Sequence, residues 1–121
     1  MAKILIMDDD PIIVAFVSNL LRDHGHGVVT AEDGQSGLDL VRRERPDLIV
    51  TDLVMPYRDG FEVLRDLKSD STLAKIPVIV VSMKEKEQEI VRVFELGAHD
   101  YVIKPFGAHE LLARIRRSLR K

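Results

Sequence analysis

Charged residues follow three of the apolar runs in this 121-residue chain. The acidic ones are Asp8 and Asp9 after residues 3–7 and Asp52 after residues 47–51, and the basic one is Lys104 after residues 101–103. If these runs are parallel strands of an open sheet, their carboxyl ends meet at one crevice, where such sheets bind ligands. Two carboxylates ~5 Å apart repel by roughly 3 kcal/mol at an effective dielectric constant of about 20. We therefore predict that a divalent metal ion and the Lys104 ammonium offset the charge there.

These residue types favour metal binding combined with phosphoryl transfer. Asp8 and Asp9 offer a few oxygen ligands and leave room for water and phosphate, which suits Mg²⁺ better than a softer metal. Asp52 is either a turn or cap residue or a candidate nucleophile, because carboxylates can form acyl phosphates. The metal would neutralise charge on the transferred group. Lys104 can pair with a phosphate or a carboxylate as a point charge.

Other polar residues leave two interpretations open. Ser82 ends the apolar run 77–82, where it either caps the following helix or donates a hydrogen bond to a phosphoryl oxygen. Tyr101 is by itself an ordinary half-buried strand residue. The four histidines form no convincing metal set, and the basic residues near the C-terminus are typical of the solvated end of a helix.

Composition limits the classes of protein that this chain can be. At 45% hydrophobic residues, residues 1–121 can form one domain with a real core. The net charge of −2 gives no general attraction to nucleic acid or anionic membranes. The absence of cysteine excludes disulfides and thiolate chemistry, and no apolar run approaches the ~20 residues of a membrane helix. We expect a cytoplasmic domain with no membrane contact.

The elements that must position these residues alternate between strand and helix patterns. The predicted strands are residues 4–7, 28–30, 48–51, 77–82 and 101–103, and helical periodicity follows each of them. This alternation predicts five βα units around a parallel sheet. Asp10 should cap the first helix, since Pro11 suits its first position. The residues expected to share that helix's apolar face are Ile12, Ile13, Phe16, Val17, Leu20 and Leu21.

The ordered set of motifs resembles the receiver domain of two-component response regulators and is similar to the chemotaxis regulator. The matching residues are Asp8-Asp9, Asp52 with Met55-Pro56 and Asp59-Gly60, Ser82, Tyr101 and Lys104-Pro105-Phe106. The resemblance covers essentially the whole chain. It implies a flavodoxin-like α/β sandwich, with a five-stranded parallel sheet in the order 2-1-3-4-5 and five helices.

The resemblance also implies a site chemistry. Asp52 would accept a phosphoryl group from a histidine kinase or a histidine phosphotransfer protein. Asp9, Asp52 and the Val54 carbonyl would bind Mg²⁺ directly, and Asp8 would bind it through water. Ser82 and Lys104 would contact the phosphoryl oxygens, and the Lys104–Pro105 bond would be cis. Such a domain is a phosphoacceptor that promotes its own phosphorylation and dephosphorylation rather than an enzyme.

The family's switch maps onto two further positions. On phosphorylation, Ser82 is expected to move toward the phosphate and Tyr101 to turn inward. This would remodel the face made by the fourth helix, fifth strand and fifth helix, which controls an output protein or an effector domain. Asp100, Glu110 and Arg114 suit a homodimer through that face, although Ile90 stands where such dimers usually carry a basic residue.

Three positions near the site depart from the common pattern. Met83 replaces the usual small residue after Ser82 and would narrow access to Asp52. Val54 cannot orient an attacking water, so slow self-dephosphorylation is expected. Lys84 could offset this or pair with the phosphoryl group.

Two other functions compete with the receiver interpretation. The first is a phosphatase resembling the haloacid dehalogenase group, in which Asp8 is the nucleophile and Asp10 the acid. It leaves Asp52 unexplained and little room for a substrate cap. The second is a receiver-like binding module that never takes phosphate, which would retain the carboxylate repulsion without using it.

Overall fold

The computed structural model describes residues 2–83 and 86–120, so the role predicted for Lys84 lies outside the described residues. Within these ranges, five strands alternate with five helices. The strands are β1 (Lys3–Met7), β2 (Gly27–Ala31), β3 (Leu48–Thr51), β4 (Val78–Ser82) and β5 (Asp100–Ile103). The helices are α1 (Pro11–Asp23), α2 (Gly34–Glu44), α3 (Gly60–Ser69), α4 (Glu87–Glu95) and α5 (Ala108–Leu119).

All strand pairs are parallel, and the strand order is β2-β1-β3-β4-β5. The flavodoxin-like fold and the strand order predicted from the sequence are therefore confirmed. The central strands β3 and β4 are apolar except for Thr51 and Ser82 at their ends, because both faces of the sheet are covered. Residues 48–51 of β3 and 78–82 of β4 are all buried.

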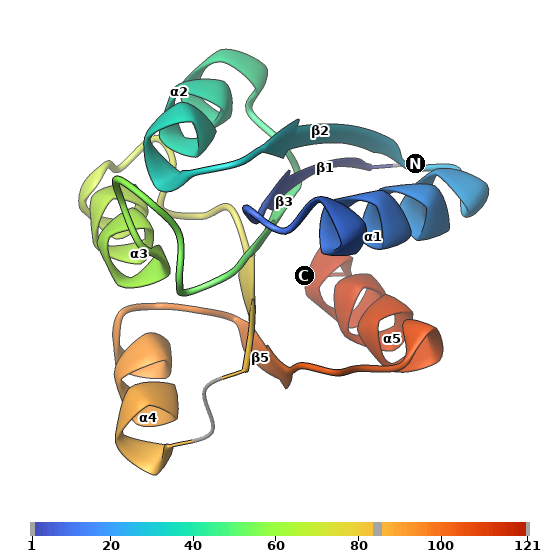
Figure 1. The fold of residues 1–121 in the computed structure, drawn as a ribbon. Coiled ribbons are helices and arrows are strands. Elements are labelled where there is room, and N and C mark those ends of the chain that lie inside the picture. The colour runs from blue at the N-terminus through green and yellow to red at the C-terminus, as the bar shows by residue number, and fades with distance from the viewer. Residues whose placement is uncertain (1, 84–85, 121) are drawn as a thin grey trace.

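Helices cover the sheet in two groups (Figure 1). The α1 and α5 helices pack on one face, where Val17, Leu21 and Ile115 join the even-numbered residues of β3. The α2, α3 and α4 helices pack on the other face around Leu38, Leu64 and other apolar side chains. Since side chains alternate along a strand, the last residue of β3 faces the second group of helices.

Acidic side chains cap the starts of α1 and α3. The Asp10 carboxylate accepts a hydrogen bond from the Ile12 amide at 2.9 Å, and Pro11 is the first residue of α1. Asp59 and Glu62 form a capping box at the start of α3. Gly25, with φ of 87°, follows the end of α1, as predicted.

One prediction about α1 is wrong in detail. Val17 and Leu21 are buried as expected, but Ile12 is 76% exposed and Phe16 is 45% exposed. At about 100° per residue, the predicted apolar face spans roughly half of the helix circumference, which is more than the sheet covers. Ser18 lies at the other side of Leu21 and completes the buried face instead.

Candidate functional site

The predicted carboxylates meet at the carboxyl edge of the sheet. Asp8 follows β1 and Asp52 follows β3, and the last residues of these neighbouring strands pair in register. One oxygen from each of Asp8, Asp9 and Asp52 lies within 4.8 Å of the other two. Asp8 is 3% exposed and Asp52 is 9% exposed, so both carboxylates are largely shielded from water. The chemistry of this donor set, three carboxylate oxygens in a small space, fits a hard divalent cation.

Lys104 reaches this cluster from the end of β5. Its Nζ donates to Asp8 Oδ2 at 2.9 Å and to Asp52 Oδ2 at 3.2 Å, and its side chain is only 12% exposed. Burial alone would lower the pKa of Lys104, but the hydrogen bonds and charges of the two aspartates outweigh it and raise the pKa. Burial raises the pKa of Asp8 in spite of the Asp10 amide and Lys104. The ammonium is therefore held protonated, while the carboxylates outnumber it among residues 2–83 and 86–120.

Backbone groups orient the Asp52 carboxylate. The Leu53 amide donates to Asp52 Oδ1 at 2.7 Å, and the Val54 amide lies 3.4 Å from the same oxygen. The Asp52 amide donates to the Met7 carbonyl at 3.0 Å, which ties the residue to β1. One carboxylate oxygen thus faces the turn that follows β3, and the other faces Lys104.

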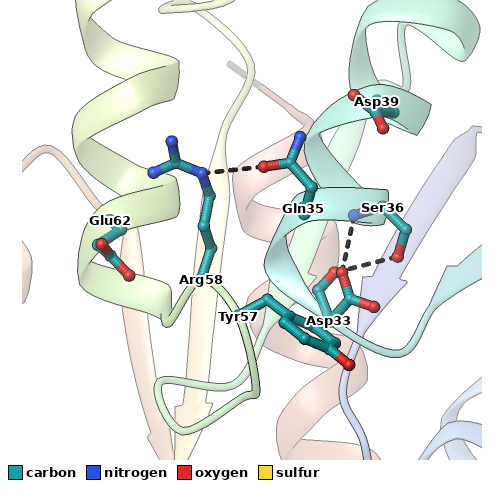
Figure 2. A pocket seen from close by; sticks show the side chains of 7 residues that line it. All are labelled: Asp33, Gln35, Ser36, Asp39, Tyr57, Arg58 and Glu62. Atoms are coloured by element: carbon teal, nitrogen blue, oxygen red, sulfur yellow. Dashed lines mark hydrogen bonds between the residues drawn. The ribbon is translucent and has the colours of Figure 1, made fainter.

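The loop after Asp52 is fastened to α2 (Figure 2). Arg58 Nε donates to Gln35 Oε1 at 3.2 Å, and Arg58 Nη1 pairs with Asp66 at 3.0 Å. Tyr57 borders the hollow between α2 and α3 and is 86% exposed with φ of 69°, an unusual conformation for a residue other than glycine. These contacts hold the end of the loop at Arg58 between α2 and α3.

Ser82 on β4 and Tyr101 on β5 are diagonal neighbours, since Tyr101 pairs with Val80. Ser82 is 1% exposed, and its side chain forms a hydrogen bond with the Tyr101 side chain. The Tyr101 residue is 8% exposed, and burial raises the pKa of its phenol against the effect of that hydrogen bond. Ser82 does not cap the following helix, because the residue at the N-cap of α4 is Lys86. Tyr101 is therefore buried beside Ser82, and its movement on phosphorylation stays a prediction.

Apolar side chains form a wall beside the acidic residues, and two of them, Ile13 and Phe16, were not predicted to lie at the site. The cleft of about 730 Å³ is lined by Asp8, Asp9, Asp52, Ser82 and Lys104 together with Ile13, Phe16, Val54, Met83 and Phe106. The ring centroids of Phe16 and Phe106 are 6.1 Å apart. Met83 is 73% exposed at the rim, in agreement with its predicted place beside the access route. The Lys104–Pro105 bond is cis, as predicted.

The residues predicted for a dimer interface contact one another within the chain. Arg114 Nη1 donates to both oxygens of Asp100 at 2.9 and 3.0 Å, and Arg117 Nη2 donates to Asp100 Oδ2 at 3.0 Å. Arg114 Nε also donates to Glu110 at 3.4 Å. The predicted homodimer remains a prediction.

The family model described as the response regulator receiver domain matches residues 4–116. The chain belongs to this family. It is 42% identical to the protein PilH of Pseudomonas aeruginosa over 115 residues, which covers 95% of each chain. It is 43% identical over 121 residues to the DNA-binding dual master transcriptional regulator RpaA of Synechocystis, covering all of this chain and 50% of that protein. The chain therefore spans about half the length of RpaA.

Solved structures agree with this assignment. The chemotaxis response regulator CheY4 of Vibrio cholerae superposes with a TM-score of 0.92 at 32% identity, with 98% of this chain and 99% of that one covered. The receiver domain of a Pseudomonas aeruginosa sensor histidine kinase gives a TM-score of 0.91 at 25% identity, with 99% and 98% covered. That structure contains a magnesium ion in its active-site cleft.

This chain is a CheY-like receiver domain of two-component signalling. The phosphatase alternative is wrong, since the family is different and the Asp10 carboxylate is used to cap α1. Receiver domains act with histidine kinases, which are the expected partner class. No helix in the described ranges is long and apolar enough to cross a membrane.

Proposed function

We propose that Asp52 accepts a phosphoryl group from the phosphohistidine of a histidine kinase or a histidine phosphotransfer protein, in a Mg²⁺-dependent reaction. The observation that carries this proposal is the packing of three carboxylate oxygens within 4.8 Å beside a lysine that bridges two of them. In the transfer, a carboxylate oxygen of Asp52 attacks phosphorus. A P–O bond forms, the P–N bond breaks, and the imidazole nitrogen leaves with the electron pair.

Asp9, Asp52 and the Val54 carbonyl are proposed to hold the ion directly, and Asp8 to hold it through water. The ion supplies positive charge that lets two anions approach and that stabilises the transferred group. The structural relative with magnesium in its cleft supports this assignment. Among the residues that the structure describes, the carboxylates outnumber the ammonium of Lys104, which supports it independently.

Lys104 and Ser82 complete the proposed phosphoryl site. The Lys104 ammonium would turn from Asp52 toward a phosphoryl oxygen while remaining close to Asp8. Ser82 would donate its hydroxyl proton to another phosphoryl oxygen and change its contact with Tyr101. The phosphorylated state would then stabilise one form of the surface made by α4, β5 and α5, which an output protein or an effector domain reads.

The domain is proposed to work in the cytoplasm as a phosphoacceptor rather than as an enzyme with turnover on a substrate. Its contribution to catalysis is to promote its own phosphorylation and dephosphorylation. RpaA, a DNA-binding regulator twice as long, supports regulation of an attached effector domain. PilH, which matches over nearly its whole length, supports action as a free-standing regulator.

The test is the intact mass of the protein after incubation with Mg²⁺ and a small acyl-phosphate donor. The wild type should gain the mass of one phosphoryl group, and Asp52→Asn should not. Asp47→Asn is the matched control, since this carboxylate accepts a bond from the Lys3 amide at the opposite edge of the sheet. It should gain the phosphoryl group as the wild type does.

Other outcomes separate the alternatives. A gain that persists in Asp52→Asn would move the nucleophile to another carboxylate and contradict the proposal. No gain with either the acyl phosphate or a phosphorylated histidine phosphotransfer domain would favour a binding module that takes no phosphate.

A further inference from the structure

Thr51 is a polar residue in a setting that is otherwise apolar. It ends β3 directly before Asp52, is 0% exposed, and lies on the face of the sheet covered by α2, α3 and α4. The preceding residues of β3 are Leu, Ile and Val. A buried hydroxyl costs free energy unless it forms a hydrogen bond, so its partner indicates what it does there.

The partner is the main-chain carbonyl of the phosphoacceptor residue. Thr51 Oγ1 donates to the Asp52 carbonyl at 3.0 Å and lies 4.0 Å from the sulfur of Met55, which covers it. Gly60 encloses the same carbonyl from the start of α3, because a Cβ atom there would lie 2.5 Å from the carbonyl oxygen. The Asp52 carbonyl is therefore held by the Thr51 hydroxyl, and the backbone of Gly60 limits the space around it.

This carbonyl belongs to the same peptide unit as the amide that holds the Asp52 carboxylate. The Asp52 C=O and the Leu53 N–H are fixed in one plane and point in opposite directions. The Leu53 N–H donates to Asp52 Oδ1 at 2.7 Å. A hydrogen bond that fixes the direction of the C=O therefore also fixes the direction of the N–H, and with it the carboxylate oxygen that the N–H holds.

We propose that Thr51 is a positioning residue that sets the orientation of the Asp52 carboxylate through the Asp52–Leu53 peptide. Oδ1 is held by the Leu53 amide, so Oδ2 is the oxygen presented to Lys104, which lies 3.2 Å away. Loss of the Thr51 hydroxyl frees the peptide to rotate and lets the carboxylate turn away from the ion and the donor. This inference rests on the proposed function, because it concerns the same carboxylate.

The experiment compares variants of Thr51 in the full chain. Thr51→Val keeps the shape and removes the hydroxyl, Thr51→Ala is a second variant without the hydroxyl, and Thr51→Ser restores it. Ser118→Ala is the matched control, since Ser118 is a buried residue on α5 and is 5% exposed. The readouts are the rate of phosphoryl gain from an acyl phosphate at saturating Mg²⁺, the Mg²⁺ dissociation constant by calorimetry, and the thermal midpoint.

Thr51→Val and Thr51→Ala should each lower the rate of phosphoryl gain by about tenfold, since small misplacements of a reacting group are costly. Both variants should also weaken Mg²⁺ binding, while Thr51→Ser stays close to the wild type. Ser118→Ala should lower the thermal midpoint without changing the rate of the folded protein. This pattern separates orientation of the carboxylate from general stability.

Three results would overturn the proposal. The first is a wild-type rate and Mg²⁺ affinity in Thr51→Val, and the second is a Thr51→Ser variant as slow as Thr51→Val. The third is a loss in rate that only follows the loss in stability, as shown by Ser118→Ala. If the wild type itself takes no phosphoryl group, the proposed function fails, and the Mg²⁺ affinities of the same variants still decide the role of Thr51.

Discussion

Two ionic clusters lie at opposite edges of the sheet and balance their charges differently. In the acidic cluster (Asp8, Asp9, Asp52 and Lys104), two buried carboxylates share one ammonium. In the Asp100 cluster (Asp100, Arg114 and Arg117), one buried carboxylate at the start of β5 is shared by two guanidinium groups. The arginine side chains are 36% and 64% exposed, so their surplus positive charge remains in water.

The contrast shows how the charge balance of a structural ion cluster differs from that of a cluster suited to bind a cation. The Asp100 cluster is neutralised by its own chain and needs nothing further. In the acidic cluster, the described residues offer two buried carboxylates one ammonium, which lowers stability unless another cation binds. Burial raises the pKa of Asp8, as expected for a site that is incomplete by itself.

Lys104→Met should produce the largest loss of stability. It leaves two buried carboxylates without their ammonium, which should lower the free energy of unfolding by about 3 kcal/mol in metal-free buffer. Added Mg²⁺ should recover part of this loss. Arg117→Met is the matched control and should cost far less, because Asp100 keeps Arg114. Urea unfolding with and without Mg²⁺ measures both, and equal losses would contradict the comparison.

Asp100→Asn should lower the free energy of unfolding by about 1–2 kcal/mol. The substitution removes the charge-assisted hydrogen bonds of the buried carboxylate, while the arginines remain solvated. The Tyr101 amide keeps an acceptor in the asparagine side-chain oxygen. The stabilisation by Mg²⁺ should equal that of the wild type in the same unfolding assay. A change in Mg²⁺ affinity would mean that the two clusters are coupled.

Val54→Asn tests how water reaches the acidic cluster. Val54 is 58% exposed at the rim of the cleft, and its side chain cannot form a hydrogen bond with a water molecule. An asparagine should speed loss of the phosphoryl group by about tenfold, or ~1.4 kcal/mol of activation free energy. The decay of the phosphorylated mass with time measures this. An unchanged decay rate would show that Val54 does not limit hydrolysis.

Asp8→Asn should stabilise the metal-free protein, unlike most substitutions of buried residues. Burial raises the pKa of Asp8, so the folded state disfavours its ionised form, and a neutral side chain should gain about 1 kcal/mol because no charge is then removed from water. The same variant should lose most of the stabilisation by Mg²⁺. A metal-free variant less stable than the wild type would show that Lys104 already balances the cluster.

His26 gives a pH reference that belongs to neither cluster. Burial lowers the pKa of His26 below its ordinary value of 6.5, and the charge of the N-terminus lowers it further. The Nδ1 atom of His26 accepts a hydrogen bond from the Ala2 amide. Its contribution to stability should be fully present above pH 6.5 and should be lost as the pH falls through that value toward the lowered pKa. His26→Gln should remove this dependence of the free energy of unfolding on pH, which amounts to under about 0.5 kcal/mol. A slope that persists in His26→Gln would assign it to other groups.

Most of the fold could be predicted because local signals agree with one another. Three to five apolar residues in a row marked each central strand, and Asp10 with Pro11 marked the start of α1. The strand ends then placed the acidic residues and Lys104 together, since parallel strands share one carboxyl edge. The overestimate of the buried face of α1 arose because residue type alone does not report how far the sheet extends beneath Ile12 and Phe16.

Details that depend on orientation could not be predicted. The sequence shows a threonine before Asp52 but not that its hydroxyl is directed to the Asp52 carbonyl. Similarly, Arg114 can pair with Asp100 of its own chain or with a second chain, and only coordinates show the internal contact. The buried position of Tyr101 is one choice among side-chain rotamers that local sequence does not determine.

The most direct test of the account is to locate the phosphoryl group itself. Borohydride reduces an aspartyl phosphate to homoserine, so peptide mass mapping after treatment with Mg²⁺ and an acyl phosphate identifies the acceptor. The account predicts conversion at Asp52, dependent on Mg²⁺ and unaffected by Asp100→Asn. Conversion at Asp8 or Asp9, or a gain in mass with no conversion at Asp52, would contradict it.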